Sequence, residues 1–260
     1  MPYQAVVTPF DNRIALKQIK QSHEKITRFS TTSGTNGTIP RIITLGGDHT
    51  VTLPALRAVH AQFGKVAVLH FDSHLDTWDP ETLASNASSY ATINHGTFLH
   101  IAHEEGLLLD GVNIHAGIRT PIFSFGDIRH DRRCGFEIVH VNQIDRIGAA
   151  GITNKLKDRI GNQKVYVTVD IDVLDPAFAP ATYPDNMLFG ADYRGTPEIG
   201  GWTTRELIQI LKGLQGINIV GGDVVEVAPP FDTQAELTGI AAAGIVELLV
   251  ELMVKRPIKD

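Results

Sequence analysis

Cysteine is almost absent from this chain, because Cys134 is the only one among 260 residues. A single thiol excludes an intrachain disulfide and leaves the redox compartment open. Apolar residues make up 43% of the chain and charged residues 20%, both ordinary fractions for a globular protein. We find no internal repeat and no domain boundary, so we expect residues 1–260 to form a single domain with a sizeable core.

The sequence also lacks a basic block, and its net charge is −6. Nucleic acid and an anionic membrane surface are therefore not expected as partners, whereas a cationic substrate is modestly favoured. No apolar run approaches the roughly 20 residues of a membrane-spanning helix. The first ten residues have neither a basic start nor a long apolar segment, so we expect no signal peptide. The compartment stays open, with cytoplasm and mitochondrion as the default alternatives.

Short apolar runs alternate with longer amphipathic stretches from residue 41 onward, after a weakly patterned segment over 1–40. We expect strands at 41–45, 66–69, 112–118, 137–141 and 165–169, and one over 217–227 that Gly221-Gly222 interrupts. Helices are expected at 14–29, 50–63, 95–109, 142–160 and 203–214, and a last long helix is expected from about 233 to about 253. The alternation predicts an α/β fold with a mostly parallel sheet between helices. The charged stretch 121–133 is expected to be a surface loop.

Two sequence patterns predict helix starts. Thr203-x-x-Glu206 and Thr233-x-x-Glu236 each have the spacing of a capping box, in which two side chains satisfy free N–H groups at a helix start. We therefore expect each threonine to cap the helix that follows it.

Polar side chains with metal-ligand chemistry follow two of the expected strands. Asp72, His74 and Asp76 come directly after one strand, and Asp170 and Asp172 follow another. Alternate side chains of an extended chain point the same way, so each set converges on one point. Ligands of parallel sheets gather at the carboxyl ends of strands. Solvated loop aspartates are the alternative, but two such segments after apolar strands favour a metal site.

Five segments, in order, resemble the ureohydrolase (arginase/agmatinase) family. They are Gly46-Gly-Asp-His49, Asp72-Ser-His-Leu-Asp76, His95-Gly-Thr, Val169-Asp-Ile-Asp-Val-Leu-Asp-Pro176 and Gly222-Asp-Val-Val-Glu-Val-Ala-Pro229. The resemblance spans residue 41 to the end of the chain. It implies a three-layer α/β/α fold and a centre of two Mn²⁺ ions that hydrolyses a guanidino group to urea and an amine.

The resemblance also implies a ligand set. One ion would be held by His49, Asp72, Asp76 and Asp170, and the other by His74, Asp72, Asp170 and Asp172. Carboxylate and imidazole ligands without thiolate suit Mn²⁺. Two such ions would lower the pKa of a shared water and give a bridging hydroxide as nucleophile.

Two further residues match family positions outside the ligand set. His95 resembles the histidine that shuttles a proton, and Glu226 resembles the carboxylate that pairs with the guanidinium. Without the resemblance, His95 would be read as a capping or surface residue and Glu226 as a solvent-facing strand residue. We assign no role to the histidines at positions 70, 100, 103, 115, 130 and 140.

Within the family the chain resembles the agmatinases most, which implies conversion of agmatine and water to putrescine and urea. Guanidinobutyrate or arginine as substrate, or a catalytically inert metal-binding homologue, are the alternatives. Two departures motivate the inert homologue: we find no counterpart of the family's first N-terminal strand before Gly46, and residues 181–194 are an insertion of about a dozen residues. The resemblance further implies a homo-oligomer, a trimer or a hexamer.

Overall fold

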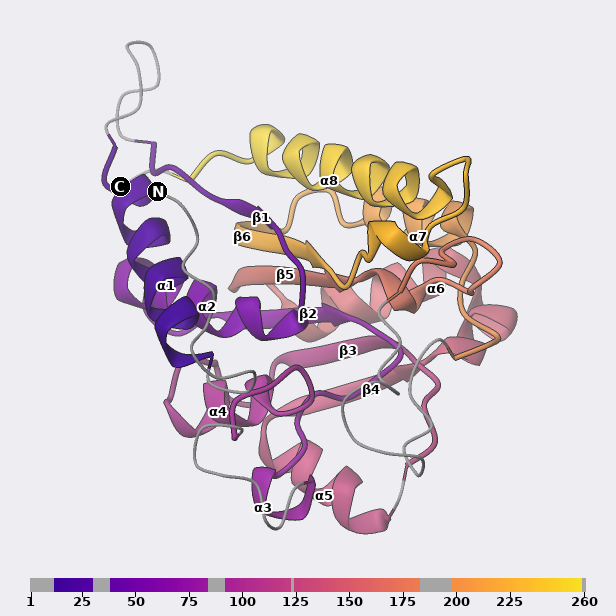
Figure 1. Ribbon diagram of the computed structural model, residues 1–260, viewed down its shortest axis with the longest axis horizontal. Helices are drawn as coiled ribbons and strands as arrows, with labels where there is room; N and C mark the ends of the chain where they lie inside the picture. The colour runs from indigo at the N-terminus through magenta and orange to yellow at the C-terminus, as the bar shows by residue number, and fades with distance from the viewer. Residues whose placement is uncertain (1–11, 30–37, 84–91, 123, 183–197, 259–260) are drawn as a thin grey trace.

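The computed structural model describes residues 12–29, 38–83, 92–122, 124–182 and 198–258. Within them, one sheet of six parallel strands has the order β1-β6-β5-β2-β3-β4 (Figure 1). The strands are β1 (Ile43–Leu45), β2 (Ala67–Phe71), β3 (Asn113–Ile118), β4 (Phe136–His140), β5 (Lys164–Asp170) and β6 (Asn218–Val225). The predicted parallel α/β sheet is confirmed.

Helices cover both faces of this sheet, as the three-layer expectation required (Figure 1). They are α1 (Arg13–Thr27), α2 (Thr52–Phe63), α3 (Pro80–Leu83), α4 (Phe98–Glu104), α5 (Phe125–Arg133), α6 (Ile144–Ile160), α7 (Thr204–Gly213) and α8 (Leu237–Lys255). The helix expected at 14–29 is confirmed as α1.

Alternation along the strands divides the buried residues into two apolar cores. In β2, Ala67, Leu69 and Phe71 pack in a core with residues of α6, α7 and α8. Val68 points the other way and packs in a second core with residues of α2 and α4. Side chains two residues apart share a face of a strand. His70 and Asp72 therefore belong to the α2/α4 side of the sheet.

The strand expected to break at Gly221-Gly222 does not break. β6 runs through both glycines and pairs with β1 on one side and β5 on the other. A Cβ on Gly222 would lie 2.6 Å from the carbonyl oxygen of Val167, and one on Gly221 would lie 3.1 Å from the ring of Tyr166. These glycines serve close approach of neighbouring groups rather than a turn.

The surface loop expected at 121–133 is largely helical, which corrects that prediction. Ser124 starts α5, and its side chain and that of Asp127 form a capping box. Asp131 on this helix is fully buried. Charge in this stretch was misread as solvent exposure, whereas the cap and the buried face of α5 decide its structure.

The start of α8 also differs from its prediction, whereas the capping box at Thr203 and Glu206 is confirmed. Glu236 makes no side-chain cap and has a φ of 51°. The carboxylate of Asp232 accepts hydrogen bonds instead from the backbone N–H groups of Thr238 and Gly239, at 3.2 and 3.0 Å. The cap therefore comes from a residue before the expected motif.

One helix of the described residues, α8, is long and apolar enough to cross a membrane by length and composition. This corrects the expectation that no segment approaches that length. Ile245, Leu249 and Leu252 of α8 are buried in the core that also contains residues of β6 and α7. The apolar residues of α8 thus have a place in the packing of this domain.

Three predictions lie outside the described residues. The signal peptide was judged on residues 1–10, and the missing first strand on the 45 residues before Gly46, of which 1–11 and 30–37 are not described. Most of the 181–194 insertion also lies outside the described residues. At the near edge of that insertion, Ala181 and Thr182 are described and buried. Ala181 accepts a hydrogen bond from the backbone N–H of Ala228 at 2.8 Å.

Candidate metal centre

The strand order brings four carboxyl ends of strands together. β5 lies between β6 and β2, with Phe71 opposite Val169 and Asp170 opposite Val225. Asp72 and Asp170 therefore leave the sheet at almost the same level on neighbouring strands. β1 flanks β6 on its other side, so the segment that follows β1 reaches the same edge with His49.

A glycine lets that segment come close. A Cβ on Gly46 would lie 2.8 Å from the Val225 side chain and 2.9 Å from that of Val51. Gly46 is therefore needed for close approach, whereas Gly47 has open space around it. The expectation of a close backbone approach at the paired glycines holds for the first of them.

Three carboxylates surround one nitrogen of His49. Its Nδ1 lies 3.2 Å from Asp72, 3.1 Å from Asp76 and 3.3 Å from Asp170, each measured to Oδ2. The opposite ring nitrogen, Nε2, is held at 2.8 Å by the hydroxyl of Thr168. A single proton on Nδ1 satisfies only one of the three carboxylates, whereas a cation placed among these groups would contact all of them.

A second group lies beside the first and shares Asp72 with it. His74 Nδ1 is 3.2 Å from Asp72 Oδ1 and 3.0 Å from Asp172 Oδ2. Asp72 thus turns one oxygen toward His49 and the other toward His74. Asp170 accepts a hydrogen bond from the backbone N–H of Asp172 at 2.8 Å. The six side chains expected as metal ligands are brought together.

The buried atoms of the cluster fit a metal ion. His49 Nδ1 and Asp72 Oδ2 are buried and make no hydrogen bond. Burial and the charge of Asp72 raise the pKa of Asp76 to about 6. Burial and the charges of Asp172 and Asp72 raise the pKa of Asp170 well above its usual range. Four carboxylates crowded out of water repel one another, and divalent cations would compensate them.

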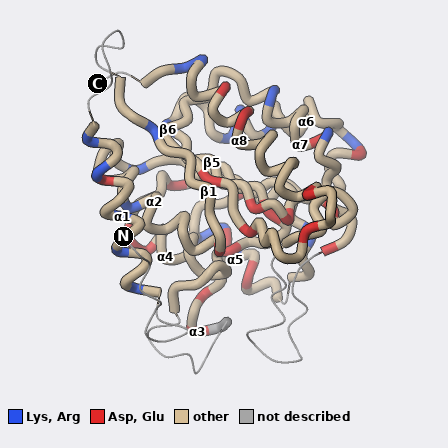
Figure 2. Tube along the Cα trace, turned by 45° about the horizontal axis from the view of Figure 1, so that its top comes forward, with Lys and Arg blue, Asp and Glu red and all other residues tan. Residues whose placement is uncertain are grey.

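Acidic residues gather at this edge more widely. In Figure 2 many red segments lie in the middle of the molecule near the strand ends, while many blue segments lie on outer helices. Two acidic residues here adopt left-handed backbone, Asp76 with φ 53° and Glu226 with φ 61°. Such conformations cost energy in non-glycine residues and cluster at functional sites.

His95 and Glu226 lie at the rim of this cluster. His95 Nδ1 is 3.4 Å from Asp48 Oδ2, and the His95 side chain is 28% exposed. Glu226 follows β6, and its Oε1 accepts a hydrogen bond from the backbone N–H of His49 at 2.5 Å. Burial and the neighbouring charge of Asp48 raise the pKa of Glu226 to about 8. Glu226 is therefore half-buried beside the cluster rather than solvent-facing.

Sequence reasoning missed His70, to which no role was assigned. His70 Nε2 lies 3.0 Å from Asp72 Oδ2 and belongs to a group of possible metal ligands with His49, Asp72 and Asp76. The signal was present, because His70 precedes Asp72 by two residues and so shares its face of β2. Burial lowers the pKa of His70 to about 3, which keeps the ring neutral.

Behind His70 runs a buried polar chain. His70 Nδ1 is 2.7 Å from His115 Nδ1, and His115 Nε2 is 2.9 Å from Asp131 Oδ1. The hydroxyl of Thr77 donates to the same oxygen of Asp131 at 2.7 Å. All four residues are buried. These hydrogen-bonded side chains connect α5 to Asp72 and hold the ring of His70 in one orientation.

Comparison with known proteins identifies the family. A family model described as the Arginase family matches residues 3–251. The chain belongs to the Arginase family. Two solved structures share the Arginase-family fold of this chain. The proclavaminate amidino hydrolase of Streptomyces clavuligerus has a TM-score of 0.77 at 30% identity, over 95% of this chain and 72% of that one. A hypothetical agmatinase of Burkholderia thailandensis has a TM-score of 0.75 at 31% identity, over 96% and 67%.

Two relatives from Schizosaccharomyces pombe are similar along nearly all of this Arginase-family chain. Putative agmatinase 1 is 47% identical over 260 aligned positions, and the alignment covers 97% of this chain and 63% of that protein. Putative agmatinase 3 is 46% identical over 261 aligned positions, and the alignment covers 97% of this chain and 60% of that protein. The chain thus spans less than two thirds of the length of these relatives.

Proposed function

We propose that this chain is a metal-dependent amidinohydrolase that converts agmatine and water to putrescine and urea. The observation that carries the proposal is His49 Nδ1 within 3.3 Å of three carboxylate oxygens in an Arginase-family fold. The names of the fission-yeast relatives support agmatine as the substrate. Guanidinobutyrate and arginine are the alternative substrates.

We also propose that the protein is a homo-oligomer, either a trimer or a hexamer. Light scattering would measure the molar mass and so distinguish the two.

Two Mn²⁺ ions are the proposed cofactor. One ion would be held by His49 and Asp76, and the other by His74 and Asp172. Both ions would share Asp72 and Asp170. The contacts of Asp72 with both His49 and His74 support its shared role. The donors are oxygen and imidazole, which suit Mn²⁺ among the divalent ions. When bound, such ions supply a water nucleophile at neutral pH.

The protein's own side chains would hold and protonate the substrate. Glu226 is proposed to bind the guanidinium, because a carboxylate matches its planar donors. A bound guanidinium would favour the ionised form of Glu226, against the burial that raises its pKa to about 8. His95 is proposed to pass a proton to the departing amine, since an imidazole exchanges protons near neutral pH. Its contact with Asp48 at 3.4 Å fixes the ring at the rim of the cluster.

Urea release tests the proposal. The chain would be loaded with Mn²⁺ and assayed on agmatine, guanidinobutyrate and arginine, with a chelator-treated sample as control. We expect the highest kcat/KM on agmatine and no urea release from the chelator-treated sample. A clear preference for arginine would refute the substrate assignment, and urea release at an equal rate after metal removal would refute the metal-dependent reaction.

An inert metal-binding homologue is the second candidate, and the insertion at 181–194 favours it. Ala181 and Thr182 are packed, so the deletion that tests it should begin at residue 183. Removing residues 183–194 leaves Ala181 and Thr182 in the chain. Urea release by the intact chain supports the enzyme, whereas activity that appears only after the deletion supports the inert homologue.

A further inference from the structure

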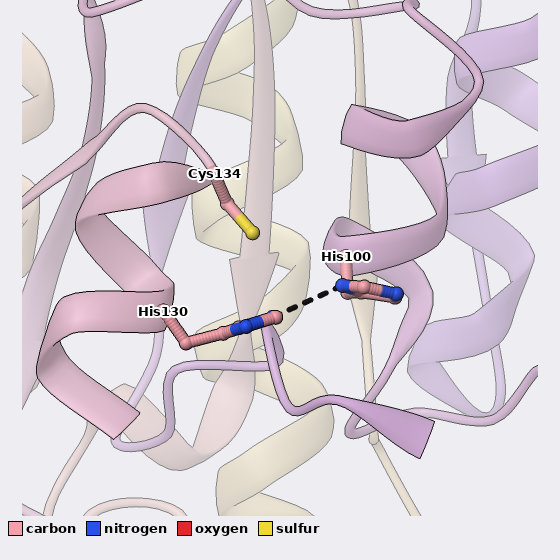
Figure 3. A group of neighbouring side chains, drawn as sticks. All are labelled: His100, His130 and Cys134. Carbon is pink, nitrogen blue, oxygen red and sulfur yellow. Dashed lines mark hydrogen bonds between the residues drawn. The ribbon is translucent and has the colours of Figure 1, made fainter. Parts of the chain in front are cut away.

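A second group of metal-binding side chains lies apart from the carboxylate cluster. His100 comes from α4, whereas His130 lies on α5 and Cys134 directly follows it (Figure 3). His130 and Cys134 are four residues apart, so they share one side of α5. His100 Nδ1 is 3.0 Å from His130 Nε2, and one donor atom from each of the three residues lies within 4.8 Å of the others.

We propose that His100, His130 and Cys134 bind a zinc-like metal ion at a site separate from the proposed Mn²⁺ centre. Two imidazoles and a thiolate suit Zn²⁺, whereas Mn²⁺ prefers oxygen ligands. Zinc bonds of about 2.0–2.1 Å to nitrogen and about 2.3 Å to sulfur place tetrahedral donors roughly 3.3–3.6 Å apart. The two rings therefore need to separate by only a few tenths of an ångström, and water would fill the fourth position.

The surroundings favour a cation. Three carboxylates, those of Asp79, Asp131 and Glu104, act on His130 against the single guanidinium of Arg133. Arg133 is itself 3.2 Å from Glu104, which offsets much of its charge. A cation entering this group would be attracted by these three carboxylates and opposed by one guanidinium, which is itself paired with Glu104.

The protonation states of the three side chains agree with ligation. Burial and the charge of His130 lower the pKa of His100, and burial and the charge of Arg133 lower that of His130. Both rings are thus neutral ligands at neutral pH. Burial and the charge of Asp131 raise the pKa of the Cys134 thiol to about 12. A metal ion would have to displace that proton, so binding should release one proton per ion.

The alternative is a purely structural pair of histidines. The rings of His100 and His130 stack with centroids 5.0 Å apart at 28°, and Cys134 is buried as small apolar residues are. The two readings differ in one respect: only the metal site makes the thiol a ligand. An ion there would also tie α4 to α5, next to Asp131 and the polar chain that ends at Asp72.

Cobalt reports the thiol directly. The full chain, first saturated with Mn²⁺, would be titrated with Co²⁺ and its near-ultraviolet absorption followed. We expect a thiolate-to-cobalt charge-transfer band that saturates at one equivalent and is displaced by Zn²⁺. Cys134 is the only cysteine, so the band has one possible source. Cobalt in the carboxylate cluster gives no such band, because that cluster contains no sulfur.

Variants provide the controls. Cys134→Ser and His130→Ala should abolish the band, while His103→Ala, on the same helix as His100 but outside the group, should keep it. Zn²⁺ should raise the Tm of the Mn²⁺-loaded chain and of His103→Ala, but not that of Cys134→Ser. Far-ultraviolet circular dichroism and bound Mn²⁺ check that each variant folds. The absence of a thiolate band in the unmodified chain, or a Cys134→Ser variant that binds Zn²⁺ as tightly, would overturn the proposal whatever the chain hydrolyses.

Discussion

At the scale of single residues, backbone strain and burial single out the same positions. Asp76 and Glu226 have positive φ, which disfavours side chains other than glycine, and both lie beside His49. His49 itself is fixed from two directions, by Thr168 through its Nε2 and by Glu226 through its backbone N–H. Preorganisation of this kind places ligand atoms before an ion arrives.

His95 and Glu226 should give opposite kinetic signatures. His95→Asn should keep both metals and reduce kcat by about 10²–10⁴, the usual contribution of general acid–base catalysis. Glu226→Gln should act mainly on KM, because a charge-assisted pair with the substrate contributes roughly 1.5–3 kcal/mol. Steady-state kinetics on agmatine measure both. Swapped signatures, or wild-type constants in both variants, would show that the assigned roles are wrong.

The buried hydrogen bonds from His70 through His115 to Asp131 should increase the affinity of the site for Mn²⁺. His115 stacks on Phe136 with ring centroids 4.1 Å apart, so His115→Phe preserves packing while removing both ring nitrogens. We expect Mn²⁺ affinity to fall about 10–100-fold, as when outer groups of other metal sites are removed. Thr203→Ala is the control, since it removes a helix cap far from the cluster and costs a typical 1 kcal/mol or so. Equal Mn²⁺ affinity in the two variants would mean that His115 is only structural.

At the scale of elements, the caps decide where helices begin. Ser124 and Thr203 act through capping boxes, as their spacing allows. α8 is different, because its first backbone N–H groups donate hydrogen bonds to the carboxylate of Asp232, which lies just before the expected motif of Thr233 and Glu236. Hydrogen bonds from the backbone help to lower the pKa of Asp232, although burial opposes the shift.

Replacing Asp232 should therefore destabilise the chain more than replacing Thr233. Asp232→Ala removes the cap of α8 and should cost about 1 kcal/mol, or about 2–4 °C in Tm for a domain of this size. Thr233 Oγ1 accepts only a 3.5 Å hydrogen bond from the backbone N–H of Leu237, so Thr233→Ala should cost less. Thermal unfolding of the two variants under identical conditions compares them. A larger decrease in Tm for Thr233→Ala than for Asp232→Ala would support the capping box that the sequence predicts.

At the scale of the whole molecule, the metal centre should contribute to stability. Asp72, Asp76, Asp170 and Asp172 are all at most 4% exposed, and ions bound among them would link the ends of β2 and β5. Binding to the folded state alone stabilises it by about 4 kcal/mol at a thousand times Kd. We therefore expect Tm to rise with Mn²⁺ concentration and to fall on chelation.

Asp72→Ala provides the matching control, because Asp72 contacts both histidine groups. This variant should lose both ions and with them the rise in Tm on adding Mn²⁺. Elemental analysis gives the stoichiometry, and differential scanning calorimetry gives the Tm. Two ions per chain in Asp72→Ala would refute the shared role of Asp72.

Much of the fold was predictable because its signals are local. An apolar strand followed by alternating carboxylates is visible over ten residues, and Asp72, His74 and Asp76 were found in this way. Predictions failed where neighbours in space decide the outcome. Gly221-Gly222 resembles a turn, but its surroundings on β5 make it part of a strand. The stretch 121–133 has few apolar residues, so its helix became evident only with its cap and the buried Asp131.

The sequence by itself determined which groups stand at each strand end, because the two-residue period of a strand fixes their common direction. Only the tertiary structure decided which ends meet: the order β1-β6-β5-β2 sets His49 beside Asp72 and Asp170, although they are far apart in the chain. The same holds for His100 beside His130 and for the path from His70 to Asp131. Ligation depends on distances of a few ångströms through space, and strand order and helix packing set those distances.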